Sequence, residues 1–503
     1  METVTQTDKA ALRVVFPALL LVMLLAALDQ TIMSTALPTI VGELGGLENL
    51  SWVVTAYLLS STIVVPLYGK FGDLFGRRLV LQIAIVVFLL GSALCGLAQN
   101  MTELVLLRAV QGLGGGGLLV TTMAAIGDMI PPQERGRYQG MFGGVFGLAT
   151  IIGPLLGGAI VEHLSWRWIF YINLPLGIVS LIAIGAAFKP HVVHVKHQID
   201  YAGAVFLAGA LICITLFTSQ GGTVLPWSSP QLWLTLCLGV ICTIGFIYEE
   251  KHAPEPLIPL FLFSERTFAL SSAISFIVGF GLFGAVTFIP LYLQVVKSSS
   301  PSMAGLQMLP MMAGMMITSI VSGRIISKIG KYRVFPIVGM AFASIGMWLL
   351  SRLQIATDVR VMYCYMALLG FGLGMVMQVL VLAAQNAAEL KHLGVVTSGV
   401  AMFRSVGGSV GVAAFGAIFS NGLHSRLAKL LSDDVQLPPT LDPVRIRQLP
   451  HAVYDTYLSA FAGSLHTVYL SAALVIMLAF AMAWWLTDIP LRPHRAEDAP
   501  FSE

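Results

Sequence analysis

The chain has little charge. Only 11% of its 503 residues are Asp, Glu, Lys or Arg, whereas 57% are hydrophobic. A soluble protein of this length needs more polar surface, so the composition excludes an ordinary soluble domain and indicates a membrane protein. The net charge of +3 is small and scattered along the chain. Nucleic-acid binding needs a concentrated basic face, so that class is excluded as well.

Cysteine is scarce, and the usual motifs of cofactor chemistry are missing. The glycine run at residues 112–117 lies in an apolar stretch and lacks the Gly-Lys-Ser/Thr ending of a phosphate-binding loop. His191, His194 and His197 form no firm metal-ligand set, so a solvated linker is the simpler interpretation. We expect no enzymatic activity, no cofactor, no nucleotide and no metal. All five cysteines lie in apolar stretches without disulfide or metal-site spacing: Cys95, Cys213, Cys237, Cys242 and Cys364.

Long hydrophobic runs dominate the chain instead. Runs of about 20 apolar residues, the length that spans a bilayer core, recur between short polar or Gly/Pro-rich breaks. The first run, residues 14–37, is longer than the apolar region of a signal peptide, so we expect it to remain as a helix. The pattern predicts an all-α polytopic membrane protein with fourteen transmembrane helices. Their predicted centres are Leu25, Ser60, Phe88, Gly115, Ile151, Val179, Gly209, Leu238, Gly281, Ile317, Phe342, Leu369, Val410 and Leu474.

The polar breaks indicate orientation and internal symmetry. Lys and Arg concentrate in the breaks on one side of the predicted helices, which predicts that both termini are cytoplasmic. The loop after the second helix, residues 69–78, matches the loop after the tenth, residues 323–331, in its glycines and following cations. This repeat divides the chain into an N-terminal six-helix bundle (1–190), an inserted two-helix hairpin (191–254) and a C-terminal six-helix bundle (255–503) with a long outer loop (421–457).

Three ionisable residues fall inside predicted helices, where a charge costs several kcal/mol unless it has a partner or faces water. Asp29 and Arg108 lie at similar depths, roughly 12 Å and 9 Å below the outer ends of their helices. Gln111 shares a face with Arg108. A carboxylate whose proton affinity depends on its neighbour suits a proton-coupled carrier, whereas a permanent ion pair would only fix helix packing. For Arg404, a packing role and a coupling role both stay open.

Two glycine-rich segments are candidates for conformational change. The loop at residues 69–78 combines Gly69 and Gly76 with Asp73 and Arg77, which can bond to neighbouring helix ends; a solvated loop is the alternative. The fifth helix has small residues that let another helix approach and a proline that can bend it, although ordinary packing would also use them. Its candidate positions are Gly143, Gly144, Gly147, Gly153, Pro154, Gly157 and Gly158.

Aromatic rings and methionines on several helices suggest a substrate surface. Aromatic faces can hold a cationic ligand, and methionine adapts to varied apolar ligands. Core packing or lipid contact is the alternative for each of these side chains. The candidates are Tyr57, Phe142, Phe146, Phe280, Phe283 and Met312.

Taken together, these motifs resemble the major facilitator superfamily, and within it the fourteen-helix drug:proton antiporter branch. The loop at residues 69–78 is similar to the superfamily's signature loop. Residues 108–112 resemble the helix-four motif linked to proton coupling, and residues 147–158 resemble the antiporter motif of helix five. Further similarity to the branch lies in residues 28–32, 36–38, 52–57, 166–170 and 173–175.

The resemblance implies alternating access, in which two halves rock about a midplane cavity and a proton gradient drives substrate outward. Asp29 would carry or relay the proton. Because Asp29 is the only clear intramembrane acid, lipophilic monocations such as antiseptics, dyes or antibiotics are the favoured substrates. Ser327 replaces the acid in the second loop copy, a departure from the pattern. The expected location is the cytoplasmic (cell inner) membrane. Export of one endogenous metabolite, lipid or siderophore and a non-transporting scaffold or sensor are the alternatives.

Overall fold

The fold is a bundle of long helices. The computed structural model describes residues 6–44, 50–187, 200–221, 225–299, 301–430 and 451–491. In those residues the regular structure is helical, apart from one bridge between Gly221 and Leu225. Helices satisfy their backbone hydrogen bonds internally, as a membrane requires of spanning segments. The predicted all-α membrane architecture is confirmed.

The N-terminal half and the insert precede residue 255. The half consists of α1 (Gln6–Leu44), α2 (Leu50–Phe75), α3 (Arg77–Leu97), α4 (Met101–Met129), α5 (Pro132–His163), α6 (Trp168–Tyr171) and α7 (Asn173–Ala187). The insert consists of α8 (Tyr201–Gln220) and α9 (Pro230–His252).

The C-terminal half repeats this pattern with additional short helices. It consists of η2 (Leu260–Ser264), α10 (Arg266–Val286), α11 (Phe288–Val295), α12 (Pro301–Gln307), α13 (Leu309–Ile329), α14 (Val334–Ser351), α15 (Val359–Ala387), η3 (Leu390–His392), α16 (Leu393–Leu430) and α18 (His451–Ala483).

Each predicted centre falls in a different long helix. Within the described residues, twelve helices are long and apolar enough to cross a membrane. α10 contributes a shorter apolar stretch, Arg266–Gly281. The 32-residue, glycine-rich α5 occupies the position of the fifth predicted span. The exact count of fourteen spans stays a prediction.

Side-chain exposure follows the helical period on the outer helices. On α3, Leu79, Ile83 and Leu90 are exposed, whereas Leu81 and Phe88 on the opposite face are fully buried. A soluble protein would place polar residues on the exposed face. This apolar outer face is the one a lipid bilayer would cover.

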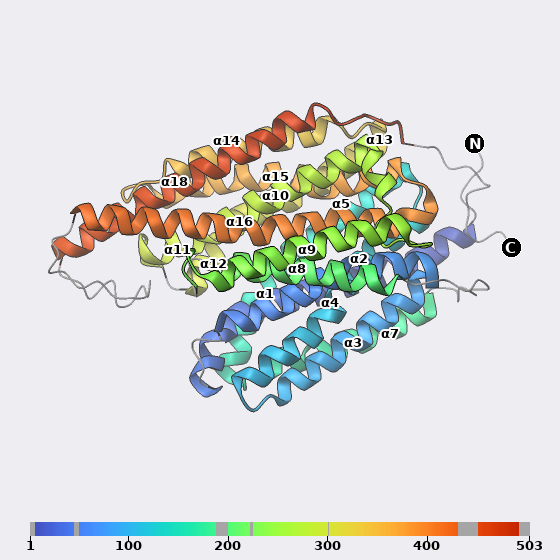
Figure 1. The fold of residues 1–503 in the computed structure, drawn as a ribbon, viewed down its shortest axis with the longest axis horizontal. Coiled ribbons are helices and arrows are strands. Elements are labelled where there is room, and N and C mark those ends of the chain that lie inside the picture. The colour runs from blue at the N-terminus through green and yellow to red at the C-terminus, as the bar shows by residue number, and fades with distance from the viewer. Residues whose placement is uncertain are drawn as a thin grey trace.

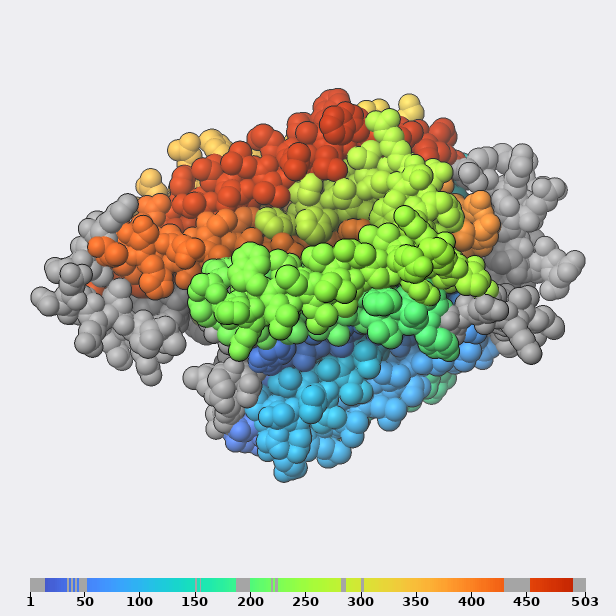
Figure 2. All heavy atoms as spheres, in the orientation of Figure 1, coloured from blue at the N-terminus to red at the C-terminus, as the bar shows by residue number. Residues whose placement is uncertain are grey.

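The two halves meet along two pairs of helices. α5 packs against α13, and α2 packs against α16. The start of α1 and the end of α18 lie at the same end of the bundle, which we call the inner end (Figure 1). α8 packs on α9, α2 and α16, while α9 exposes Leu234, Ile241 and Ile244. Figure 2 shows the insert, in green, lying between the blue N-terminal half and the orange and red C-terminal half.

The outer loop is shorter than the predicted range of residues 421–457. α16 continues to Leu430 and α18 begins at His451, because the two helices keep packing against each other along their length. The Phe419 and Phe461 rings, for example, lie 5.1 Å apart. Residues 431–450, and the histidine linker at residues 191–197, lie outside the described residues.

Candidate functional site

A buried polar cluster lies in the N-terminal half, where α1, α4 and α7 meet. Arg108 Nη1 lies 2.8 Å from Asp29 Oδ2. Gln111 Nε2 donates to Asp29 Oδ1 at 2.7 Å, and Asn173 Nδ2 donates to the same oxygen at 2.9 Å. Asp29 is only 4% exposed. Three donors therefore surround this carboxylate, and the predicted grouping of Asp29, Arg108 and Gln111 is what the structure contains.

Arg108 is held on several sides within this cluster. Its Nη1 also donates to Gln111 Oε1 at 2.8 Å, and its Nε donates to the Val53 carbonyl at 3.4 Å. The guanidinium carbon lies 4.3 Å from the centre of the Tyr57 ring, a cation–π distance. Tyr57 is 1% exposed, so it supports Arg108. In this conformation the Tyr57 ring faces Arg108, and a role for Tyr57 in substrate binding stays a prediction.

Sequence reasoning missed two members of this cluster. Asn173 Nδ2 also donates to Ser92 Oγ at 3.0 Å, and Ser92 Oγ donates to the Phe170 carbonyl at 2.8 Å. Both side chains are fully buried. An amide at the first position of the apolar α7 was the available signal, because a polar side chain at the start of such a run needs a partner.

The chemistry of the cluster follows from its enclosure. Protonating Asp29 would leave the buried Arg108 cation without its counter-charge, and an uncompensated buried charge is strongly destabilising. Proton uptake at Asp29 must therefore accompany a rearrangement around Arg108. The coupling hypothesis and the fixed-pair hypothesis differ only in whether this ion pair opens during transport.

The predicted loop residues connect the two halves at the inner end. Asp73 accepts hydrogen bonds from the backbone N–H groups of Gly394, at 2.9 Å, and Val395, at 3.0 Å, in the first turn of α16. Arg77 pairs with Asp73 and with Asp128, the latter at 2.6 Å. The acid at the end of α4, Asp128, was not predicted. This loop therefore acts as an anchor for the other half, which a merely solvated loop would not.

Gly69 and Gly76 serve this anchor in different ways. A Cβ on Gly69 would lie 2.3 Å from the Ser398 hydroxyl of α16, so no larger residue fits without a shift. Gly76 has φ of 84°, a conformation that L side chains rarely adopt, and it allows the sharp turn between α2 and α3.

The glycines of α5 face two different neighbours. A Cβ on Gly143 would lie 2.4 Å from Ser319 Oγ of α13, and one on Gly147 would lie 3.4 Å from Met316 Cβ. A Cβ on Gly153 would instead lie 2.0 Å from Thr31 Oγ1 of α1. The inner glycines thus allow contact between the halves, and Gly153 allows contact within its own half.

The remaining α5 candidates carry fewer contacts. Gly144 faces Ile320 of α13, with 3.3 Å between a built Cβ and the Ile320 Cδ1. Gly157 is buried, and a Cβ on Gly158 would meet nothing within 4 Å. The side chain of Pro154 lies outside the described part of the structure.

The predicted aromatic and methionine candidates do not converge on one surface. Phe142 is fully buried, with its ring 6.1 Å from that of Phe16, and its place on a cavity wall stays a prediction. Phe146 is half-buried in the N-terminal half, and Phe280 packs 5.0 Å from Phe415 in the other. Met312 lies beside Gly147 between the halves. The side chain of Phe283 is outside the described residues.

A second polar network joins four helices across the halves and was not predicted. Gln139 Nε2 of α5 donates to Gln385 Oε1 of α15 at 2.9 Å. Gln385 Nε2 donates to Thr397 Oγ1 of α16 at 2.8 Å and to the Met123 carbonyl of α4 at 3.4 Å. The glutamines and the threonine are buried. We call these residues, Gln139, Gln385 and Thr397, the inner network.

The outer end of α1 is attached to the segment before α6. Trp166 Nε1 donates to Glu43 Oε2 at 2.8 Å, and Arg167 pairs with the other carboxylate oxygen. The Arg167 hydrogen bond lowers the pKa of the Glu43 carboxyl below its usual value. This contact gives a structural role to the Trp-Arg segment singled out in the sequence.

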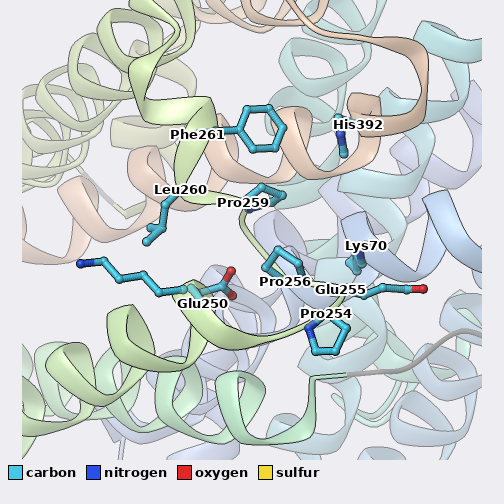
Figure 3. A pocket seen from close by; sticks show the side chains of 10 residues that line it. Lys70, Glu250, Pro254, Glu255, Pro256, Pro259, Leu260, Phe261 and His392 are labelled. Carbon is cyan, nitrogen blue, oxygen red and sulfur yellow. The ribbon is translucent and has the colours of Figure 1, made fainter.

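A surface pocket of about 420 Å³ lies where the insert rejoins the C-terminal half. Figure 3 shows Lys70 and His392 on one side of it and Glu250 on the other. Glu250 accepts hydrogen bonds from the backbone N–H groups of Leu257, at 3.0 Å, and Ile258, at 3.2 Å. Glu250 therefore fixes the turn after α9. The residues that line this pocket include none of the predicted site residues.

The fold consists of two helical bundles that are joined by helix contacts and hydrogen bonds, and one bundle contains a buried carboxylate–arginine cluster. These features define a membrane transporter of the two-bundle class. The model of the Major Facilitator Superfamily matches residues 19–412, and the chain belongs to this family.

Relatives and solved structures agree with this assignment. The chain is 37% identical to the multidrug transporter protein MdtP of Bacillus subtilis, over 95% of this chain and 94% of that protein. It is 34% identical to multidrug resistance protein 3 of the same organism, over 95% of this chain and 96% of that protein. The proton:xylose symporter XylE covers 96% of this chain and 98% of its own with a TM-score of 0.65. At 14% identity, that likeness shows the fold alone.

Proposed function

We propose that this protein exports amphipathic small molecules, such as drugs, antiseptics or dyes, in exchange for protons by alternating access. The observation that carries the proposal is the Asp29 cluster, a buried carboxylate whose proton cannot be gained without disturbing Arg108. The two multidrug-named relatives support export of varied compounds.

We place the inner end of the bundle in the cytoplasm, with both termini there, in the cytoplasmic membrane. Lys70, Arg137, Arg324 and Lys328 lie in the helix ends and loops at this end, in keeping with the preference of basic residues for the cytoplasmic side. The halves are bonded together here through Asp73 and the inner network. Substrate access from the cytoplasm would require these contacts to open.

The test compares Asp29→Asn with the double variant Asp29→Asn/Arg108→Gln. The single change leaves Arg108 buried without its counter-charge, so we expect thermal stability to fall; a broken buried pair costs roughly 3–5 kcal/mol. The double change removes both charges and is expected to restore most of that stability. Both variants should lose export driven by a pH gradient in inverted vesicles.

The double variant separates coupling from packing. If it is stable and still accumulates substrate in response to a pH gradient as the unmodified protein does, Asp29 is a packing residue and the coupling proposal is wrong. Substrate breadth is measured in the same vesicles with structurally unrelated amphipathic compounds. Transport of a single compound from such a panel would favour export of one endogenous metabolite instead.

A further inference from the structure

Arg404 is a cation in the middle of α16 for which the function proposed so far has no use. Its side chain is half-buried, and no ion pair or side-chain hydrogen bond joins it to any residue that the structure describes. Arg108, by contrast, is fully buried and has Asp29 as its partner. An unpaired charge at membrane depth is costly unless it faces water or a ligand.

Helix geometry places Arg404 on the same face of α16 as Thr397. Thr397 precedes it by seven residues, which is two turns less about 20°, so the two side chains share a face. Thr397 belongs to the inner network, where α4, α5, α15 and α16 meet. The backbone of α10 touches Gly407 and Gly411, and Gly411, seven residues after Arg404, lies on the same face of α16 farther toward the outer end. Because Thr397 bonds directly to Gln385, Arg404 lies on the face of α16 that meets α15 at the inner network, about 10 Å farther toward the outer end.

A second unpartnered polar group lies at the same height. α15 runs opposite to α16, and Gln378 precedes Gln385 by seven residues, so it shares the face of Gln385 and the level of Arg404. Its Oε1 is buried and has no hydrogen-bond partner among the described residues. A buried polar atom without a hydrogen-bond partner is destabilising, and a bound ligand or water commonly supplies that partner.

The two groups have complementary needs that a ligand can meet. Arginine presents a planar fork of N–H donors that matches a carboxylate, sulfonate or phosphate, and the Gln378 amide has both N–H donors and an acceptor. In this conformation the Asp29 carboxylate is not available to a cationic ligand, because Arg108, Gln111 and Asn173 donate hydrogen bonds to its oxygens. The monocation preference drawn from sequence rested on Asp29 alone.

We propose that Arg404 and Gln378 bind the anionic group of the exported substrate, and that this substrate is an amphipathic molecule with one negative charge. The inference rests on the proposed export function and names the charge class of its substrate. The apolar body of such a molecule would extend between the halves, away from the inner network.

The test measures equilibrium binding to the purified protein in lipid nanodiscs. The probes are 2-naphthalenesulfonate and 2-naphthyltrimethylammonium, which share a ring system and keep opposite charges at every pH used. We expect the unmodified protein to bind the sulfonate roughly tenfold or more tightly than the ammonium, in line with hydrogen bonds to a charged group. Equal binding, or tighter binding of the ammonium, would overturn the proposal without any variant.

Variants then locate the site. Arg404→Gln should weaken sulfonate binding roughly tenfold or more and leave ammonium binding unchanged, and Arg404→Lys should fall between. Gln378→Glu should give Arg404 a partner, abolish sulfonate binding and raise thermal stability. The matched control is Arg352→Gln, since Arg352 lies over the Trp348 ring near the outer end of α14. Unchanged sulfonate binding in both Arg404→Gln and Gln378→Glu would refute the assignment.

Transport measurements separate the proposed anion site from the proposed function of proton-driven export. Because both probes are permanently ionised, a pH gradient does not concentrate them by itself. Proton-driven export of the ammonium but not the sulfonate would leave the export proposal standing and reject the anion site. Absence of proton-driven export for every amphipathic compound, with sulfonate binding intact, would reject the function and keep the site.

Discussion

The two loop copies of the internal repeat allow a direct comparison between the two contacts that join the halves, α2 with α16 and α5 with α13, which we call the two seams. In the first copy, Gly69 lies against α16, and in the second, a Cβ on Gly323 would lie 2.0 Å from the Gly136 carbonyl of α5. Both copies turn through a glycine of positive φ, 84° at Gly76 and 73° at Gly330. Each half therefore touches the other through the same element, used twice.

The side chains at these seams differ in strength. Asp73 accepts from two backbone N–H groups at the start of α16, where a negative charge is favoured by the helix dipole. Ser327, at the matching position, accepts one hydrogen bond from the described residues, from the Arg137 N–H near the start of α5 at 3.2 Å. Charge-assisted hydrogen bonds are about twice as strong as neutral ones. The α2–α16 seam is therefore held by charge, and the α5–α13 seam by close backbone packing.

The largest expected effect comes from removing the charge. Asp73→Ala removes two charge-assisted hydrogen bonds between the halves, worth roughly 3 kcal/mol together, so the open inner end should gain roughly 100-fold in population. Distance distributions between spin labels at the exposed positions Leu79 and Val334, in a background without the native cysteines, measure this. Asp128→Asn is the control, because the hydrogen-bond partner of Asp128 among the described residues is Arg77 of its own half. An equal shift in both variants would contradict the asymmetry.

The second-largest effect is expected from an added methyl group at the α5–α13 seam. Gly323→Ala forces the helices apart, at a cost of about 1–3 kcal/mol for overpacking, and should also favour the open inner end. Gly158→Ala adds the same methyl where nothing lies within 4 Å. The label distances and the transport rate should respond to the first change and not to the second. A similar response to both would mean that helix propensity, and not the seam, sets the outcome.

The smallest effect is expected at Ser327. Ser327→Ala removes one neutral hydrogen bond, worth about 1 kcal/mol, whereas Ser327→Asp should convert the weak contact into a charge-assisted one and stabilise the closed inner end. The same pair of spin labels reports both shifts. If Ser327→Asp opened the inner end, the two loop copies would not be equivalent.

The sequence predicted what depends on local periodicity and depth. All fourteen predicted centres fall in separate helices, because the bilayer thickness sets the length of each apolar run. Asp29 and Arg108 were paired by their depths, and Gln111 by its three-residue spacing.

Contacts set by helix crossing could not be predicted in this way. Gln139 and Gln385 are 246 residues apart and belong to different halves. Tyr57 lies over Arg108 where two glycines of α4 make room: a built Cβ on Gly112 would lie 2.4 Å from the Tyr57 carbonyl, and one on Gly115 would lie 2.3 Å from its hydroxyl. The periodicity of α2 alone carries no information on this approach.

The position of α8 makes the molecule unequal toward its surrounding lipid. α8 lies across α2 and α16, while the insert has no comparable packing against α5 and α13 among the described helices. Acyl chains can therefore press directly on the glycine-lined seam but reach the charged seam only around a helix. The insert therefore determines which of the two contacts between the halves lies next to lipid: the α2–α16 contact is covered by α8, and the α5–α13 contact is not covered by the insert.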